Sequence, residues 1–169
     1  MKRICISLIA LFFCSVTYLQ TTIPQAQTLF IYNFSKLIEW PLNYRTGSFI
    51  IGVLGTTEVA EALETYTKGK KVGAQDISVI RYKCPGDIAA CHILFVPFTR
   101  TKQMAEILSA LNGKSTLIIT EKNGALNEGA AINFIVVQNK MKFELKPENA
   151  GKLGIKFSSK LQELAAQSM

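Results

Sequence analysis

The chain has 169 residues, of which 49% are hydrophobic and 18% are charged. This composition is too apolar for a disordered chain and suffices for one core, so we expect one domain. Lys and Arg outnumber Asp and Glu by 19 to 12, which gives a net charge of +7, but they are spread along the chain without interleaved aromatic residues. That pattern argues against nucleic-acid binding. One histidine and four cysteines exclude a multi-histidine metal site and a disulfide-dense miniprotein.

Residues 1–26 have the layout of a secretory signal peptide. The basic start Met1–Arg3 precedes an uncharged, almost wholly apolar run over residues 4–16, and polar or turn-forming residues follow. The run is shorter than the roughly 20 residues that a membrane-spanning helix needs, and no later run is long enough to span a membrane. We expect export and cleavage after Ala26. The alternatives are a buried N-terminal helix and a lipoprotein anchored at Cys14, and the two phenylalanines before that cysteine disfavour the second.

Apolar residues in the following segments alternate between helical and strand periods. The first helical stripe ends at Pro41, and glycines bound the first apolar strand. In chain order, we predict a helix over 26–40, a strand over 48–54, a helix from a Thr56–Thr57 cap to Tyr66, a turn or short edge strand at 69–73, a strand over 77–82, a helical turn beginning at Pro85, a strand over 92–96, a helix over 101–111, a strand over 116–119 and a loop or short helix over 123–129.

The last part of the chain has a different pattern. Two short strands, 131–137 and 140–145, flank Gln138–Asn139, which predicts an antiparallel hairpin. Pro147 can begin a helix, and Ser158–Ser159 can cap a final one. We therefore predict an α/β fold for a single domain over 27–169. It would be a three-layer sandwich, with a mostly parallel sheet, helices on both faces and an antiparallel C-terminal hairpin.

Motifs for catalysis are not visible, so we do not expect an enzyme, a metal or a cofactor. His92 precedes a predicted core strand, which favours a structural role, and no P-loop or Gly-x-Ser-x-Gly pattern occurs. One turn remains as a candidate ligand site, because backbone N–H groups at a helix start can hold an anion. It comprises Gly52, Gly55, Thr56 and Thr57. A tight strand-to-helix turn would need the glycines in any case.

Cys84 and Cys91 are the two cysteines that remain after removal of the leader. Two cysteines in an oxidising compartment are expected to pair, and the short loop between them permits a disulfide. Such a bond would be either a static staple or a redox-responsive switch. A metal pair is disfavoured, because only His92 lies nearby and zinc sites usually need four ligands.

Six segments, in chain order, carry a recognisable set of motifs. They are YNFSKLIEWP at 32–41, FIIGVLG at 49–55, CHILFV at 91–96, INF at 132–134, KFEL at 142–145 and GIKFSSKL at 154–161. Together these segments resemble the YfiR/HmsC family of periplasmic proteins, and the resemblance covers nearly the whole chain after the leader.

The resemblance implies a non-enzymatic periplasmic regulator with an α/β sandwich fold that is often dimeric. Its partner would be the periplasmic sensor region of an inner-membrane diguanylate cyclase, which it would repress and so limit cyclic-di-GMP and biofilm formation. The partner could instead be a membrane histidine kinase. A different class of function is a small-molecule sensor, using the Gly52–Thr57 turn or a cleft beside the last helix. No cysteine follows Cys91, so a redox mechanism based on a later cysteine pair does not transfer to this chain.

For partner binding we select the C-terminal block. An apolar strip edged by charge is what a binding surface needs. The candidate residues are Phe143, Glu144, Leu145, Lys156, Phe157 and Ser158. The alternative for Phe143, Leu145 and Phe157 is that they belong to the core.

Overall fold

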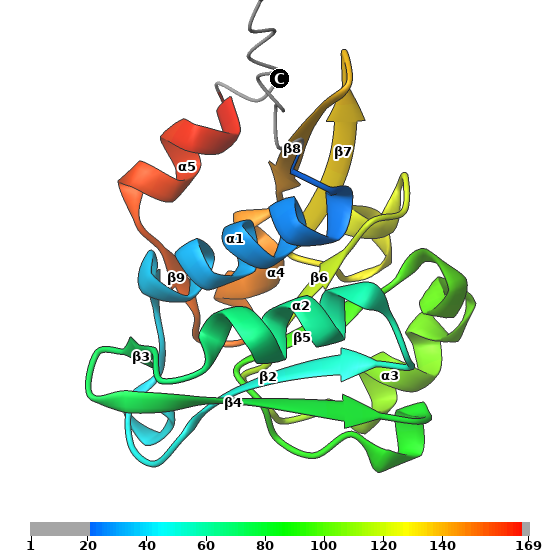
Figure 1. Ribbon diagram of the computed structural model, residues 1–169. Coiled ribbons are helices and arrows are strands. Elements are labelled where there is room, and N and C mark those ends of the chain that lie inside the picture. The colour runs from blue at the N-terminus through cyan, green and yellow to red at the C-terminus, as the bar shows by residue number, and fades with distance from the viewer. Residues whose placement is uncertain (1–20, 167–169) are drawn as a thin grey trace, which may run out of the picture.

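A computed structural model describes residues 21–166 (Figure 1). Residues 1–20, which contain most of the predicted leader and Cys14, lie outside the described residues. In chain order, the elements are α1 (Ile23–Lys36), β1 (Ile38–Glu39), β2 (Phe49–Leu54), α2 (Glu58–Thr67), β3 (Lys71–Val72), β4 (Gln75–Tyr82), β5 (Ile93–Val96), α3 (Met104–Ala110), β6 (Leu117–Thr120), β7 (Ile132–Val137), β8 (Lys140–Leu145), α4 (Pro147–Gly151), β9 (Lys156–Phe157) and α5 (Ser159–Ala166). Short 3-10 turns cover Leu42–Tyr44, Pro85–Asp87, Phe98–Gln103 and Ala125–Glu128.

Seven strands form the main sheet, in the order β3-β4-β2-β5-β6-β7-β8. The five inner strands are parallel, and β3 and β8 pair antiparallel at the two edges. This confirms the predicted α/β class, the mostly parallel sheet and the C-terminal hairpin. Gln138 and Asn139 form the hairpin turn with φ of 50° and 60°, the left-handed values that a tight two-residue turn requires.

Successive residues of the inner strands contribute to two separate hydrophobic clusters. Ile51 and Val53 of β2 pack in the cluster that contains α1 and α2, whereas Leu54 packs in the cluster that contains α3. Because neighbouring residues of a strand point to opposite faces, we infer that the two clusters lie on opposite sides of the sheet. Figure 1 shows α1 and α2 running side by side.

The predicted helix over 26–40 is shorter at its C-terminal end than its apolar stripe suggested. The helix α1 ends at Lys36, and Ile38 and Glu39 instead form β1, which pairs antiparallel with β9. Ile38 and Trp40 are buried in the first cluster. An isolated helical pattern could not reveal this change, because the partner strand lies more than a hundred residues later in the chain.

At its other end, α1 begins inside the segment assigned to the leader. Thr22 caps the helix together with Gln25: the Thr22 N–H donates to Gln25 Oε1 at 3.0 Å, and Thr22 Oγ1 accepts from the Gln25 N–H at 3.4 Å. Gln27 is buried and its side-chain amide donates to Glu121 Oε2 at 2.6 Å. The predicted cleavage after Ala26 would therefore divide a capped helix.

Candidate functional site

The predicted partner-binding residues on β8 are not all available at the surface. Phe143 is only 1% exposed, and its ring centroid lies 4.7 Å from that of Phe34 and 5.5 Å from that of Phe30. Both neighbours come from α1, whose apolar face covers this part of the sheet. Phe143 is thus a core residue, and its assignment to a binding surface is wrong. Leu145 is half-buried and packs against the same cluster.

Glu144 takes part in a polar chain that crosses three strands. Its carboxylate accepts from Asn133 Nδ2 at 3.1 Å, and Asn133 Oδ1 accepts from Thr120 Oγ1 at 3.0 Å. Asn133 and Thr120 are fully buried. The half-buried Glu144 carboxylate thus supplies an acceptor for the Asn133 amide N–H, which would destabilise the fold if it were left unpaired. A charge reversal at Glu144 would therefore disturb folding.

The residues around β9 form a small ribbon with β1. Phe157 is opposite Ile38, and Lys156 is opposite Glu39. Lys156 and Glu39 are exposed, whereas Phe157 packs against the core. Ser158 stabilises the start of α5, since its hydroxyl oxygen accepts from the Leu161 N–H at 3.2 Å. The strand β8 belongs to the seven-stranded sheet and β9 to the two-stranded one, so the six predicted residues do not form one continuous strip of paired strands.

The predicted ligand turn begins inside β2, at Gly52, and continues past its end, and most of its residues have local structural roles. A Cβ at Gly52 would lie 2.7 Å from the Tyr82 ring, so this glycine is required for packing. Gly55 has a φ of +87° and lies beneath the Arg100 side chain. Thr57 caps α2 by accepting from the Ala60 N–H at 3.2 Å, and Thr56 is exposed. The sequence carried no signal that Arg100, which follows β5, would lie over this turn.

His92 is a structural residue, in agreement with its position before a core strand. It is 4% exposed and its ring stacks on Phe49 with centroids 4.2 Å apart. Nδ1 accepts from the Ile50 N–H at 3.0 Å, which leaves the proton on Nε2 to be donated to the Tyr44 carbonyl at 2.7 Å. Burial lowers the pKa of His92, and the bond to Tyr44 opposes that shift. The ring is therefore held neutral.

The two cysteines are free thiols, one exposed and one buried. Burial raises the pKa of the Cys91 thiol to about 12. The thiolate is the species that attacks a disulfide or an electrophile, so its burial disfavours reaction of Cys91 in the folded protein. Its pairing with Cys84 stays a prediction.

We expect the reduced, folded protein to react with a thiol reagent at one site quickly and at a second site only after unfolding. The fast site is Cys84, because it is exposed, and a Cys84→Ser variant should lose the fast phase alone. The measurement is a time course of reagent uptake with and without denaturant. Two fast thiols would contradict the burial of Cys91, and no thiol in protein prepared without reductant would reveal the disulfide.

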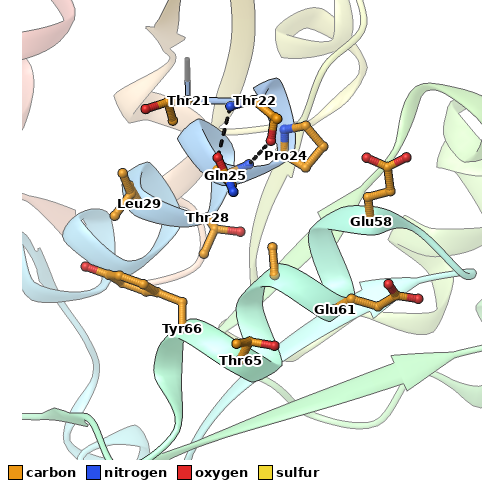
Figure 2. Close-up of a pocket in the computed structure, with 11 residues that line it drawn as sticks. Thr21, Thr22, Pro24, Gln25, Thr28, Leu29, Glu58, Glu61, Thr65 and Tyr66 are labelled. Carbon is orange, nitrogen blue, oxygen red and sulfur yellow. Dashed lines mark hydrogen bonds between the residues drawn. The ribbon is translucent and has the colours of Figure 1, made fainter. Parts of the chain in front are cut away.

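A cleft of about 800 Å³ lies between α1 and α2. Figure 2 shows Glu58 and Glu61 toward one end and Leu29 and Tyr66 toward the other, with the side chain of Thr28 between the helices. Thr28 is 2% exposed, and its hydroxyl has no hydrogen-bond partner among the described residues. The sequence carries no local signal of this cleft, because residues before 27 have the pattern of a leader and the lining comes from two separate helices.

Among residues 21–166, no helix is long and apolar enough to cross a membrane, and no group of three or more His, Cys, Asp or Glu is arranged to hold a metal ion.

The sequence was also compared with known proteins and protein families. No curated protein matches the sequence. A family model described as YfiR/HmsC-like matches residues 24–166, which includes every strand and nearly all of every helix. The chain therefore belongs to the YfiR/HmsC-like family.

Proposed function

We propose that this protein is a periplasmic regulator that binds the periplasmic region of an inner-membrane diguanylate cyclase and represses it. The observation that carries the proposal is the family match over residues 24–166. The family is regulatory and non-catalytic, and it is associated with control of diguanylate cyclase signalling. A leader for export, as predicted from residues 1–26, is consistent with that location.

Repression by binding requires that the protein prefer one state of its partner. If it binds the inactive state of the cyclase more tightly than the active state, the difference in affinity sets the degree of repression. A coupling of about 1–3 kcal/mol, typical of such systems, corresponds to roughly 5–150-fold. No group in the regulator needs to react, which suits a chain whose histidine and buried cysteine are both packed in the core.

For the contact surface, we propose the outer side of the β1–β9 ribbon. Lys156 is exposed there beside Glu39, whereas Phe157 anchors the ribbon from below. An exposed pair of opposite charges beside a partly buried aromatic ring offers an electrostatic pattern to a partner. Leu145 and Glu144 on β8 remain a second, separate part of the proposed surface.

The partner can be identified by capture from solubilised membranes, with the exported protein as bait, in parallel with and without reductant. Recovery of a diguanylate cyclase is the expected result. Recovery of a histidine kinase would keep the regulatory class and replace the partner. If reductant abolished the recovery, a Cys84–Cys91 bond would become the switch. Recovery of no membrane protein in either condition would contradict the proposal.

A charge reversal at Lys156 tests the ribbon surface. We expect Lys156→Glu to weaken partner binding about tenfold or more, because charged contacts at interfaces contribute at that scale. The melting temperature should change little, since Lys156 is exposed and the new like-charge pair with Glu39 costs less than about 1 kcal/mol.

The matched control for this variant is Lys102→Glu, which makes the same charge change at an exposed position on the Phe98–Gln103 turn. Equal binding by the Lys156 variant and wild type would exclude the ribbon from the interface. Equal weakening by both variants would indicate a general effect of net charge.

A further inference from the structure

The first turn of α1 is part of the folded domain. Its N-cap is Thr22, whose N–H donates to Gln25 Oε1 and whose hydroxyl oxygen accepts from the Gln25 N–H (Figure 2). Pro24 lies in this turn, where a proline is tolerated because the N–H of that position has no partner within the helix. The family match also begins at residue 24, ahead of the cleavage predicted after Ala26. Residues 22–26 thus form a helix start, and the end of the leader has to be sought before them.

A chain that began at Gln27 would lose the carbonyl groups to which the next turn of α1 is bonded. In an α-helix each N–H donates to the carbonyl four residues earlier, so the N–H groups of residues 27–30 depend on residues 23–26. Gln27 and Thr28 are each 2% exposed, so their freed N–H groups would have little access to water. A new ammonium group at this point would also oppose the helix dipole. Cleavage after residue 26 would therefore destabilise α1.

The start of α1 is also tied to the sheet. Gln27 Nε2 donates to Glu121 Oε2 at 2.6 Å, and Glu121 Oε1 accepts from the Phe98 N–H at 3.0 Å. Glu121 directly follows β6, and Phe98 lies in the turn after β5, so one carboxylate joins α1 to the carboxyl ends of two neighbouring strands. Fraying of the first turn of α1 would weaken this connection.

The sequence before Thr22 contains a better bond for removal of the leader. Signal peptidases need small residues one and three positions before the cleaved bond. Between the end of the apolar run at Val16 and the Thr22 cap, only the bond after Thr17 meets this rule, with Ser15 at the other position. The bond after Ala26 fails, because a proline occupies the other position. Residues 15–18 lie outside the described residues, so this step rests on the sequence alone.

We propose that the leader is removed at the Thr17–Tyr18 bond, so that the exported protein begins at Tyr18 and keeps the whole of α1. The cleavage is a hydrolysis: water adds across the peptide bond, which leaves a carboxylate on Thr17 and an ammonium group on Tyr18. Residues 18–21 then separate the new ammonium group from the Thr22 cap. The proposal rests on the periplasmic location given in the proposed function.

The mass of the protein recovered from the periplasm tests the assigned bond, with the full chain expressed in a bacterium that exports it. The expected mass is that of residues 18–169. The mass of residues 27–169, or of any other product, would overturn the assigned bond and leave the proposed function standing. Recovery of the chain only in uncleaved form inside the cell would overturn both the cleavage and the periplasmic function.

Two matched substitutions place the same side chain before each candidate bond. Thr17→Gln should slow removal of the leader at least tenfold, so that uncleaved chain accumulates, because a long side chain replaces a small one. Ala26→Gln should be processed to the same bond as wild type, and glutamine is a good helix former at this position of α1. Slow processing of the Ala26 variant with normal processing of the Thr17 variant would overturn the proposal.

The melting temperature of the exported protein gives an independent test, since it reports whether the cap is retained. Thr22→Ala should lower the melting temperature by about 2–4 °C, the range for loss of an N-cap in a domain of this size. Thr21→Ala, at the exposed neighbouring position, should leave the melting temperature unchanged. If the exported Thr22 variant melted as wild type, the cap would be absent from the exported protein and the proposal would be overturned.

Discussion

Replacing Phe143 by alanine is expected to lower the free energy of unfolding by about 3–5 kcal/mol, the range for removing a large aromatic side chain from a core. The ring is 1% exposed and contacts Phe30 and Phe34 of α1, which in turn lie close to Phe134 of β7. Its loss leaves a cavity between α1 and the C-terminal hairpin. Urea unfolding, followed by circular dichroism, measures the change.

Leu145→Ala provides the matched control for Phe143, because it shortens an apolar side chain of the same strand. Leu145 is only half-buried, so a smaller loss of about 1 kcal/mol is expected. If Phe143→Ala kept the wild-type stability and lost affinity for the membrane partner, the ring would belong to a binding surface. At temperatures where the variant is folded, we expect its partner affinity to be retained.

Replacing His92 by alanine is expected to cost about 3 kcal/mol, since three favourable features disappear together. The Ile50 N–H loses its acceptor, the Tyr44 carbonyl loses its donor, and the ring no longer stacks on Phe49. Trp40 and Tyr44 also pack edge-on against the imidazole. Tyr44 therefore gains mobility in the variant, and its Leu42–Tyr44 turn should lose hydrogen-exchange protection.

The wild-type protein should also lose stability as the pH falls below the ordinary histidine pKa of about 6.5. Burial lowers the pKa of His92 in the folded state, so in this range the unfolded chain binds the proton and the folded chain does not. The loss begins near pH 6.5 and ends at the lowered pKa of the folded state, whereas above pH 6.5 His92 contributes no pH dependence. Protonation in the folded state would break the Ile50–Nδ1 bond.

Unfolding curves at a series of pH values for wild type and His92→Gln measure this effect, because other titrating groups contribute equally to both. The wild type should lose more stability than the variant between pH 7 and pH 5. Parallel pH profiles would mean that His92 titrates as freely in the folded protein as in the unfolded chain.

Much of the fold follows from local sequence pattern, and so does its family. Apolar runs such as 49–54 and 93–96 predict buried strands because both faces of a parallel sheet are covered. Gln138–Asn139 predicts the hairpin because the turn needs residues that tolerate a left-handed backbone. Each of these signals lies within a few neighbouring residues, so it can be read without knowledge of the rest of the chain.

The features that decide the candidate sites depend on contacts between distant segments. The pairing of Ile38 with Phe157 ends the α1 stripe early and creates the ribbon. The strand pattern left Phe143 open as a surface or a core residue, and the approach of α1 buries it. The cleft around Thr28 exists because α1 begins before residue 27 and packs beside α2.

Sequence by itself thus determined the α/β class, the hairpin, the structural role of His92 and membership of the YfiR/HmsC-like family. Tertiary structure alone decided which apolar residues are buried, where Arg100 and Thr28 lie, and that the C-terminal block is divided between β8 and β9. The physical reason is that secondary structure follows from the spacing of neighbouring side chains. Burial and cavities follow from which distant surfaces pack together.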